Sequence, residues 1–456
     1  MNYKYNCGIY IGRFQPFHKG HLHIVEQMMK ECRKVVVVIG SANKGNTERN
    51  PLTYYERKTI IDKVIGDLGY QYRVNVVGID DRKDISNDSS WGEYVKEQLS
   101  LQGIEFDAIY EGYELERVYW YSTLNIPVTW LDRVFDISAT KVREALKQDN
   151  RELYEKYMPE SLHKDFDNLR YLINNTRRER IVQWIREYFA DNREGKAIIG
   201  ISGGKDSTIA AALCVEALGA DRVIGVLMPN MVQNDIYDSY EVVSRLQIQY
   251  HVVNIGAVCN ELYRSLSDAV FLSGGIKAVK SNTMITTNIP ARLRMTALYA
   301  IAALYPNSRV CGTSNLSEIT VGYCTKGGDT VNDFAPLANC TVEEVYQVGE
   351  EYIQQGKLPK RLVYKTPSDG MSGMSDEEKM GVPYDAIDKS INNRYVGEKE
   401  ARIIRDMNIK TRHKFELSPR PPRMHEQLKV TDAHTTELNN IISSLLEELR
   451  NYENNH

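Results

Sequence analysis

The residues of this chain with the clearest chemical meaning form the stretch Ser202-Gly203-Gly204-Lys205-Asp206-Ser207, which directly follows the apolar run Ala197–Ile201. A β-branched run that ends in two glycines and opens into Ser-Thr-Ile-Ala-Ala predicts a strand, a turn and a helix whose first amides bind phosphate. It is not a Walker A loop, because Asp206 follows the Gly-Lys pair and Ile199 stands where that pattern needs glycine. The stretch therefore predicts a nucleotide site; a Gly-rich turn without a ligand is the alternative.

Two histidines, His18 and His21, stand three residues apart after the apolar run Cys7–Gly12. At the start of a helix such residues lie on one face, and Gly20 between them lets a ligand approach the backbone. A zinc site would need a neighbouring Glu in a His-Glu-x-x-His pattern and a third ligand at motif spacing, which the sequence lacks. We favour imidazoles that donate hydrogen bonds to a polyphosphate, aided by the helix dipole, over a zinc pair or a plain surface pair.

A further segment, Ile137–Arg143, could also contact phosphate. Ser138 and Thr140 can cap a helix, and Arg143 one turn inside it is a bidentate partner for phosphate. Alone this is an ordinary capped helix. Together with the histidine pair it completes a clamp for a triphosphate.

These segments resemble the His-x-Gly-His nucleotidyltransferases. The stretches Gly40–Lys44, Asn50–Thr53 and Glu56-Arg57 narrow the resemblance to nicotinamide mononucleotide adenylyltransferases of the archaeal type, over about residues 7–147. The resemblance implies in-line attack of a mononucleotide phosphate on the α-phosphate of ATP, with Mg²⁺ bridging the phosphates and pyrophosphate leaving. It also implies that Trp91 stacks on the nicotinamide ring, unless it is a plain core aromatic. The residues expected to contact ATP are Gly12, Arg13, Phe14, His18, His21, Ser138, Thr140 and Arg143.

In the second half of the chain, acidic and basic residues follow the glycine loop in a suggestive order. Asp206 and Glu318 each come after a strand-like run and suit Mg²⁺ held on triphosphate oxygens. Arg292 and Lys326 can meet substrate phosphates or a carboxylate. Each residue is weak evidence alone, but their order and spacing resemble ammonia-dependent NAD synthetase over about residues 165–415.

This second resemblance implies that the nicotinate carboxylate of deamido-NAD attacks the α-phosphate of ATP, giving an acyl adenylate and pyrophosphate. Ammonia then displaces AMP to form the amide. The residues expected to bind ATP are Gly200, Ile201, Ser202, Gly203, Gly204, Lys205, Asp206, Ser207, Thr313 and Ser368, with Asp206 and Glu318 on Mg²⁺. Those expected to bind the dinucleotide are Arg292, Lys326, Asp333, His413 and Lys414, and Lys326 joins His18, His21 and Arg143 as a catalytic residue.

The sequence departs from this family's pattern in two places. Thr313-Ser314-Asn315 replaces a frequent Thr-Asp-His, and Val342 replaces a lysine that usually contacts ATP, which removes that phosphate contact. An amidase domain that would use glutamine is also missing, so free ammonia is the expected nitrogen donor. The alternative order of reactions is amidation of nicotinate mononucleotide first and adenylation of the amide second. A nucleotide-sensing module in one half is disfavoured because the acids, histidines and cations above are all present.

The elements that must position these residues form two series. Apolar β-rich runs alternate with helical stretches, which predicts an α/β fold with two Rossmann-like parallel sheets. The two resemblances imply that the first is a His-x-Gly-His nucleotidyltransferase fold and the second a PP-loop fold. The runs are Cys7–Gly12, Lys34–Gly40, Tyr72–Ile79, Phe106–Gly112 and Val128–Leu131, then Ala197–Ile201, Val223–Pro229, Tyr250–Ile255 and Arg309–Thr313. We expect domains at residues 1–155 and 156–430 and an amphipathic helix within 431–456, for docking or oligomerisation.

The bulk composition is that of an ordinary globular protein of 456 residues, long enough for two or three domains. A net charge of −4 gives no basic field for a nucleic-acid partner. No signal peptide or membrane-spanning run is present, so a cytoplasmic location without a membrane partner is expected. The seven cysteines show no Cys-x-x-Cys pair and predict neither a zinc site nor a disulfide framework. At least a homodimer is expected, by analogy with NAD synthetases.

Overall fold

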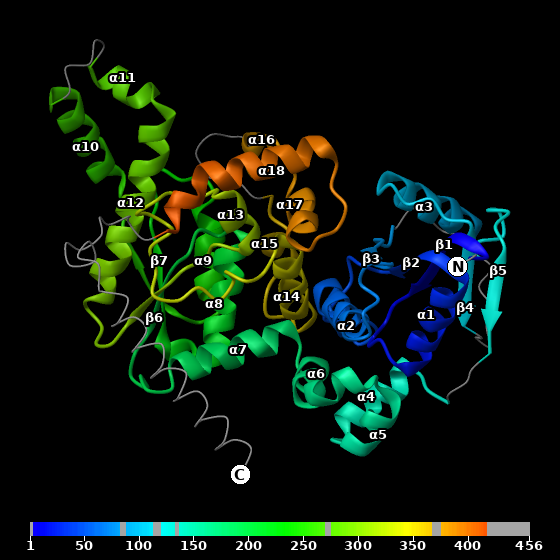
Figure 1. The fold of residues 1–456 in the computed structure, drawn as a ribbon. Helices are drawn as coiled ribbons and strands as arrows, with labels where there is room; N and C mark the ends of the chain where they lie inside the picture. The colour runs from blue at the N-terminus through cyan, green and yellow to red at the C-terminus, as the bar shows by residue number, and fades with distance from the viewer. Residues whose placement is uncertain are drawn as a thin grey trace, which may run out of the picture. The chain divides into compact units, whose positions relative to one another are not determined.

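The computed structural model of the protein describes residues 3–82, 88–112, 120–132, 136–269, 275–366 and 375–416 (Figure 1). The chain divides into two compact units, Met1–Lys414 and Phe415–His456. All but two residues of the second unit lie outside the described ranges. The fold of the first unit is therefore the one that positions the predicted sites.

The first sheet is parallel, with the strand order β3-β2-β1-β4-β5. Its strands are β1 (Tyr5–Gly12), β2 (Cys32–Ile39), β3 (Val74–Gly78), β4 (Ala108–Gly112) and β5 (Val128–Leu131). The helices between and after them are α1 (Lys19–Glu31), α2 (Tyr54–Asp67), α3 (Asp88–Leu101) and α4 (Ala139–Lys147). The order reverses at β1, so the loop after β1 lies at a switch point, where such sheets bind ligands.

Both faces of this sheet are buried, which explains why its strands are almost continuous apolar runs. Along β2, Val35 and Val37 pack into a cluster with α1, α2 and α4, whereas Val36 and Val38 pack into a cluster with α3. The alternation follows from the two-residue period of a strand.

The helices after the first sheet belong to the same core. They are α5 (Arg151–Tyr157), the 3₁₀ helix η1 (Glu160–Asp165) and α6 (Phe166–Asn174), and their apolar residues up to Ile173 join the cluster of α1 and α2. The next cluster begins with Val182 on α7 (Arg177–Tyr188). The change from one core to the next thus falls between Ile173 and Val182; the boundary near residue 155 stays a prediction. We call residues up to 174 the N-terminal half and residues 177–416 the C-terminal half.

The second sheet is also parallel, with the order β8-β7-β6-β9. Its strands are β6 (Ala197–Gly200), β7 (Val223–Leu227), β8 (Gln249–Val252) and β9 (Arg309–Cys311). One face is covered by α7, α8 (Lys205–Leu218) and α9 (Ile236–Arg245), and the other by α10 (Gly256–Ala269), α11 (Gly275–Ser281) and α12 (Thr283–Ala302). The loop after β6 lies at this sheet's switch point.

Further helices complete the C-terminal half, and several of them enclose a third apolar cluster that includes Val342 and Ile387. They are η2 (Ala220–Arg222), α13 (Leu316–Val321), α14 (Val342–Gln354), α15 (Lys360–Val363), α16 (Asp376–Met380), α17 (Tyr384–Ile391), α18 (Glu398–Thr411) and η3 (Arg412–Lys414). Within the described ranges, no helix is long and apolar enough to cross a membrane.

The predicted fold class is confirmed: two parallel α/β sheets, each with its ligand loop after its central switch strand. Every predicted strand run contains a strand, with ends that differ by a few residues. Ser368 and the predicted C-terminal helix lie outside the described residues.

Candidate functional sites at the two switch points

The histidine pair forms the start of α1. His18 is the N-cap, and its ring stacks on that of His21 with centroids 3.6 Å apart. The backbone N–H of Gly20 donates to Nδ1 of His18, and the N–H of His18 donates to Nδ1 of His21, each at 3.2 Å. The predicted placement of both rings on one face of the helix start is confirmed.

These contacts fix the chemistry of the two rings. A nitrogen that accepts a backbone hydrogen bond carries no proton, so in the neutral rings the proton lies on Nε2. Burial and the neighbouring His18 hold the pKa of His21 well below its ordinary value, which keeps this ring neutral at physiological pH. The pair therefore offers Nε2–H donors, as an anion site requires.

Arg143 reaches the same loop from α4. Its guanidinium donates to the carbonyl oxygen of Gln15 at 2.8 Å and to Oγ1 of Thr140 at 3.2 Å. Ser138 caps α4, because its Oγ accepts from the N–H of Lys141. The fold thus brings the predicted clamp segments, far apart in sequence, to one place.

Arg57, a residue without a predicted role, organises the loops around this site. It is fully buried, and burial lowers its pKa to about 10, which leaves it charged at neutral pH. Its donors reach backbone carbonyls of three loop segments, those of Arg13, Gly40, Ser41, Lys44 and Thr53. Buried Gln15 ties the same region together by donating to and accepting from the backbone of Leu52. Polar residues in the Asn50–Arg57 motif were the available sequence signal for this frame.

Trp91 lies in the first turn of α3 and is half-buried. Its ring is 5.3 Å from that of Tyr94 and packs against the apolar cluster under α3. The structure therefore shows the core packing that was one of the two expected roles. Stacking on a nicotinamide ring stays a prediction.

In the C-terminal half, the predicted phosphate loop connects β6 to α8. Gly203 has φ +77°, and a Cβ atom there would lie 2.6 Å from Cβ of Asp238, so only glycine fits. Ser202 and Ser207 brace the turn: their hydroxyl groups lie 3.0 Å apart, and the backbone N–H of Ser202 donates to Oγ of Ser207 at 3.2 Å. The loop presents the N-terminus of a 14-residue helix at an open edge of the sheet.

Asp206 and Glu318 converge beside this loop. Asn315 links them: its Nδ2 donates to Oδ1 of Asp206 at 3.2 Å, and its backbone N–H donates to Oε2 of Glu318 at 3.2 Å. Burial, then the nearby Asp206 carboxylate, raises the pKa of Glu318 to about 8. Two oxygen ligands forced together in this way fit Mg²⁺, which takes one or two carboxylates and completes its shell with phosphate oxygens and water.

Lys205 contacts these acids rather than the open end of the loop. Only 2% of the residue is exposed, and its Nζ lies 2.6 Å from Oδ2 of Asp206, between the rings of Tyr346 and Tyr384. Burial alone would lower its pKa, but Asp206 and Glu318 raise the pKa above its ordinary value. Binding of ATP by the loop stays a prediction, in which the buried Lys205 side chain would act through its contact with Asp206.

The predicted dinucleotide residues meet at the segment 322–328. Arg292 donates to the carbonyl of Lys326, whose Nζ donates to the carbonyl of His413 at 2.7 Å. Nζ of Lys414 donates to the carbonyls of Gly322 and Cys324. Arg292, Lys326 and His413 are exposed and can reach a ligand.

Asp333 has a different environment. Its carboxylate accepts from the N–H of Val310 on β9 and from the hydroxyl of Tyr299 on α12. These contacts give it a structural role at β9, and its contact with the dinucleotide stays a prediction. Thr313 follows β9 at the carboxyl edge of the sheet, as predicted.

Comparison with known proteins assigns a family model to each half of the chain. The NAD synthase family matches residues 177–418, more than half of the chain. The chain belongs to the NAD synthase family. A cytidylyltransferase-like family matches residues 9–145, the part that carries the histidine pair and Arg143.

The NAD synthase domain has close relatives. The NH₃-dependent NAD⁺ synthetase of Methanoregula boonei is 36% identical over 216 residues, 47% of this chain and 81% of that protein. That of Alkaliphilus metalliredigens is 35% identical over 247 residues, 53% and 96% respectively. Among solved structures, the NMN synthetase of Francisella tularensis is 30% identical and covers 54% of this chain and 98% of its own, with a TM-score of 0.48.

The structure shows the surroundings of the residues at the two places where the sequence differs from the NAD synthetase pattern. Asn315 caps α13 and bridges the acid pair. Val342 is buried in the third apolar cluster, so its side chain offers nothing to a phosphate. Among the described residues, no group of three or more His, Cys, Asp or Glu side chains forms a metal site, which leaves the acid pair with Asn315 as the oxygen-rich candidate.

The low pKa of His21 predicts a pH-dependent stability. The unfolded chain binds a proton at this histidine more readily than the folded chain does. The contribution of neutral His21 to stability is therefore fully present above the ordinary histidine pKa and is lost as the pH falls from that value toward the lowered pKa of the folded state. The variant His21→Gln lacks this loss. Its melting temperature relative to the native protein should therefore be higher at pH 5 than at pH 7.5; an equal difference at both pH values would show that His21 is not held neutral.

The carbonyl contacts of Arg57 predict a large loss of stability on substitution. Arg57→Met should lower the free energy of unfolding by about 3–5 kcal/mol, because several buried carbonyls lose their donors at once. The control is Arg73→Met: Arg73 also donates to backbone carbonyls but is only half-buried, so water can replace it and about 1 kcal/mol is expected. Urea denaturation measures both, and equal losses would refute the role of Arg57.

Proposed function

We propose that this protein is a bifunctional enzyme of NAD biosynthesis. The N-terminal half would transfer the adenylyl group of ATP to nicotinamide or nicotinate mononucleotide. The C-terminal half would amidate deamido-NAD with ammonia and a second ATP. The observation that supports this most is that predicted site residues lie together at each of two switch points: the histidine pair with Arg143, and the Asp206–Glu318 pair beside the glycine loop.

In the N-terminal half, the chain acts by positioning and charge. The Nε2–H groups of His18 and His21 would hold phosphate oxygens at the helix N-terminus, and the Arg143 guanidinium would balance charge that develops on the α-phosphate. The mononucleotide phosphate is itself the nucleophile, so no protein side chain needs to attack. This agrees with the described residues of the N-terminal site, where the imidazoles and Arg143 come together as hydrogen-bond donors.

In the C-terminal half, Asp206 and Glu318 would hold Mg²⁺, which when bound neutralises the triphosphate oxygens of ATP. Amides at the start of α8 would receive the pyrophosphate that leaves. Arg292, Lys326, His413 and Lys414 would orient the dinucleotide so that its carboxylate meets the α-phosphate. Ammonia then attacks the acyl adenylate and AMP leaves.

Variants that disable one half test the assignment. His21→Ala should lower kcat/KM for adenylyl transfer by about 100-fold, the usual effect of losing one transition-state donor, and leave amidation unchanged. Glu318→Gln should do the reverse. Each reaction is followed separately by chromatography of its dinucleotide product. If either variant abolished both reactions, or the native protein performed neither, the assignment would be wrong.

The same assays settle nitrogen source and reaction order. Ammonium should support amidation and glutamine should not. The alternative order, amidation of the mononucleotide before adenylation, is favoured if the Gly40–Lys44 and Asn50–Thr53 stretches carry the amide preference of the archaeal type. Comparing nicotinate mononucleotide with deamido-NAD as the substrate of the His21→Ala variant distinguishes the two orders.

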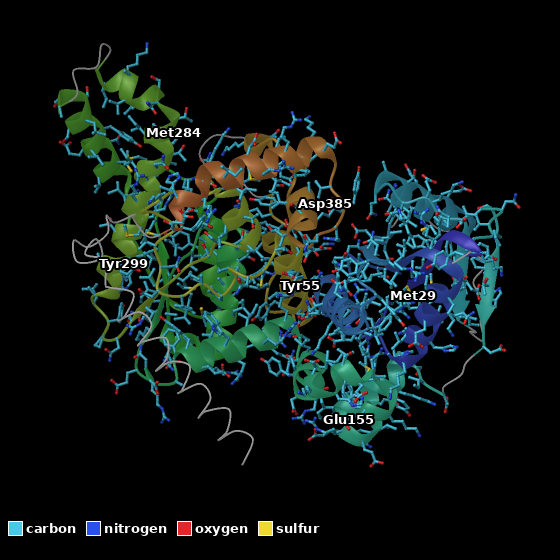
Figure 2. The ribbon with its side chains drawn as sticks, in the orientation of Figure 1. Met29, Tyr55, Glu155, Met284, Tyr299 and Asp385 are labelled. Carbon is cyan, nitrogen blue, oxygen red and sulfur yellow. The ribbon has the colours of Figure 1, made fainter. Side chains whose placement is uncertain are left out.

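We also propose that the protein is at least a homodimer. The outer surface of the C-terminal half carries exposed apolar side chains on edge strand β8, α10 and α12. They include Tyr250, Val252, Val258, Leu262 and Met284; Figure 2 shows Met284 and Tyr299 on α12. Light scattering should give at least twice 52.2 kDa, whereas a stable monomer at micromolar concentration would exclude the dimer.

A further inference from the structure

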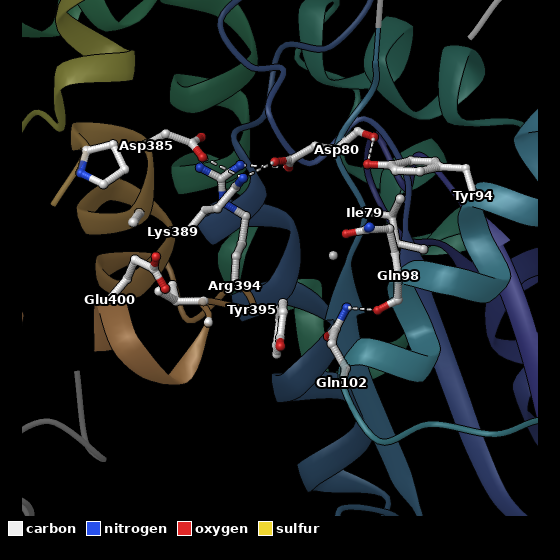
Figure 3. A pocket seen from close by; sticks show the side chains of 15 residues that line it. Ile79, Asp80, Tyr94, Gln98, Gln102, Asp385, Lys389, Arg394, Tyr395 and Glu400 are labelled. Carbon is white, nitrogen blue, oxygen red and sulfur yellow. Dashed lines mark hydrogen bonds and ion pairs between the residues drawn. The ribbon is translucent and has the colours of Figure 1, made fainter. Parts of the chain in front are cut away.

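The two halves contact each other through a buried arginine. Arg394, between α17 and α18, is 8% exposed. Its Nη1 lies 2.7 Å from Oδ1 of Asp80, directly after β3, and its Nη2 lies 2.8 Å from Oε2 of Glu343 on α14. Nζ of Lys389 on α17 is 3.5 Å from the other oxygen of Asp80. Figure 3 shows Lys389, on α17, and Arg394, in the loop after α17, directed toward Asp80.

Asp80 belongs to the segment that flanks the predicted mononucleotide site. Its carbonyl accepts from the hydroxyl of Tyr94, whose ring packs on Trp91. The next residue, Asp81, accepts from Ser41 in the loop after β2, which Arg57 holds. A displacement of Asp80 would therefore affect both the Trp91–Tyr94 pair and the loop after β2.

On the other side, Arg394 is linked to the acid pair of the synthetase site. The N–H of Glu343 donates to Oδ2 of Asp388 at 2.7 Å, and Oδ1 of Asp388 accepts from the hydroxyl of Ser317. Ser317 directly precedes Glu318 on α13. One turn before Asp388 on α17, Tyr384 places its ring 5.5 Å from the ammonium of Lys205. Helix α17 thus contacts Lys205 of the synthetase site and, through Lys389, Asp80 beside the predicted mononucleotide site.

Polar contacts carry much of this connection. A cavity of about 350 Å³ adjoins Arg394, lined by Asp80, Tyr94 and Gln98 on one side and by Lys389, Tyr395 and Glu400 on the other (Figure 3). Apolar packing is therefore incomplete here. Burial also raises the pKa of Glu343 to about 7, so Arg394 lies in a poorly solvated place where its charge interacts strongly.

We propose that Arg394 is a positioning residue for adenylyl transfer, acting from the synthetase half through Asp80, and that the same guanidinium couples the two sites through Glu343. The proposal rests on the function proposed above. It explains why a charged residue is buried at this junction, where each of its two partners belongs to the surroundings of a different site.

The test compares Arg394→Gln with Arg178→Gln in the full chain. Arg178 is a suitable control, because it is equally buried and also contacts carboxylates, those of Glu179, Glu216 and Glu351, but all three belong to the C-terminal half. Arg394→Gln should raise KM for the mononucleotide in adenylyl transfer by about fivefold or more, the lower end of typical coupling between sites. Arg394→Lys should recover part of this loss, and Arg178→Gln should leave this KM unchanged.

Hydrogen exchange provides a readout that does not need activity. Backbone amides of residues 40–47 and 79–82 should exchange faster in Arg394→Gln than in Arg178→Gln. If both variants show the same KM and the same exchange, the role of Arg394 is purely structural and the proposal is overturned. If the native protein performs no adenylyl transfer, the proposed function fails. In that case, faster exchange confined to Arg394→Gln would still support the positioning of these loops by Arg394. Unchanged exchange in Arg394→Gln would refute this positioning.

Discussion

A buried cation beneath each phosphate loop is the interaction on which both candidate sites depend. Strands of a parallel sheet end together, and the loops that follow them leave carbonyl and carboxylate oxygens close to one another. In the N-terminal half, Arg57 donates hydrogen bonds to five of these carbonyl oxygens. In the C-terminal half, Lys205 lies against the paired acids. Burying a charge is unfavourable unless its partners are in place, so each cation commits its loop to one geometry.

The same constraint explains how the sites differ in charge. The N-terminal site is built of neutral or cationic donors: two Nε2–H imidazoles and Arg143. It is ready for an anion. The C-terminal site contains two carboxylates and one lysine, and burial, then the nearby Asp206 carboxylate, raises the pKa of Glu318. It is ready for a cation, which then brings the phosphates. The two candidate sites therefore differ in the charge that each offers to a ligand, as the two proposed reactions would require.

Much of this organisation could be predicted from the sequence. Strands covered on both faces are apolar runs, and the residues directly after them lie at ligand edges, so His18, His21, Asp206 and Glu318 could be found by inspection. The contacts that hold them could not. In the sequence Arg57 is only one arginine of a motif, and its role depends on the three loops that the fold brings around it. Lys205 is expected from the sequence to bind ATP, and its burial could not be predicted because it depends on Tyr346 and Tyr384, far along the chain. Asp333 and Arg394 depend in the same way on residues distant in sequence.

The central claim is that one chain carries two ATP-dependent steps of a single synthesis. The most direct measurement is the stoichiometry of the complete reaction, with purified protein, nicotinate mononucleotide, ATP, Mg²⁺ and ammonium. Whichever step comes first, each NAD formed should be accompanied by two pyrophosphates and one AMP, because adenylyl transfer releases pyrophosphate and amidation releases both. NAD formed with a single pyrophosphate, or no NAD despite turnover of ATP, would contradict the account.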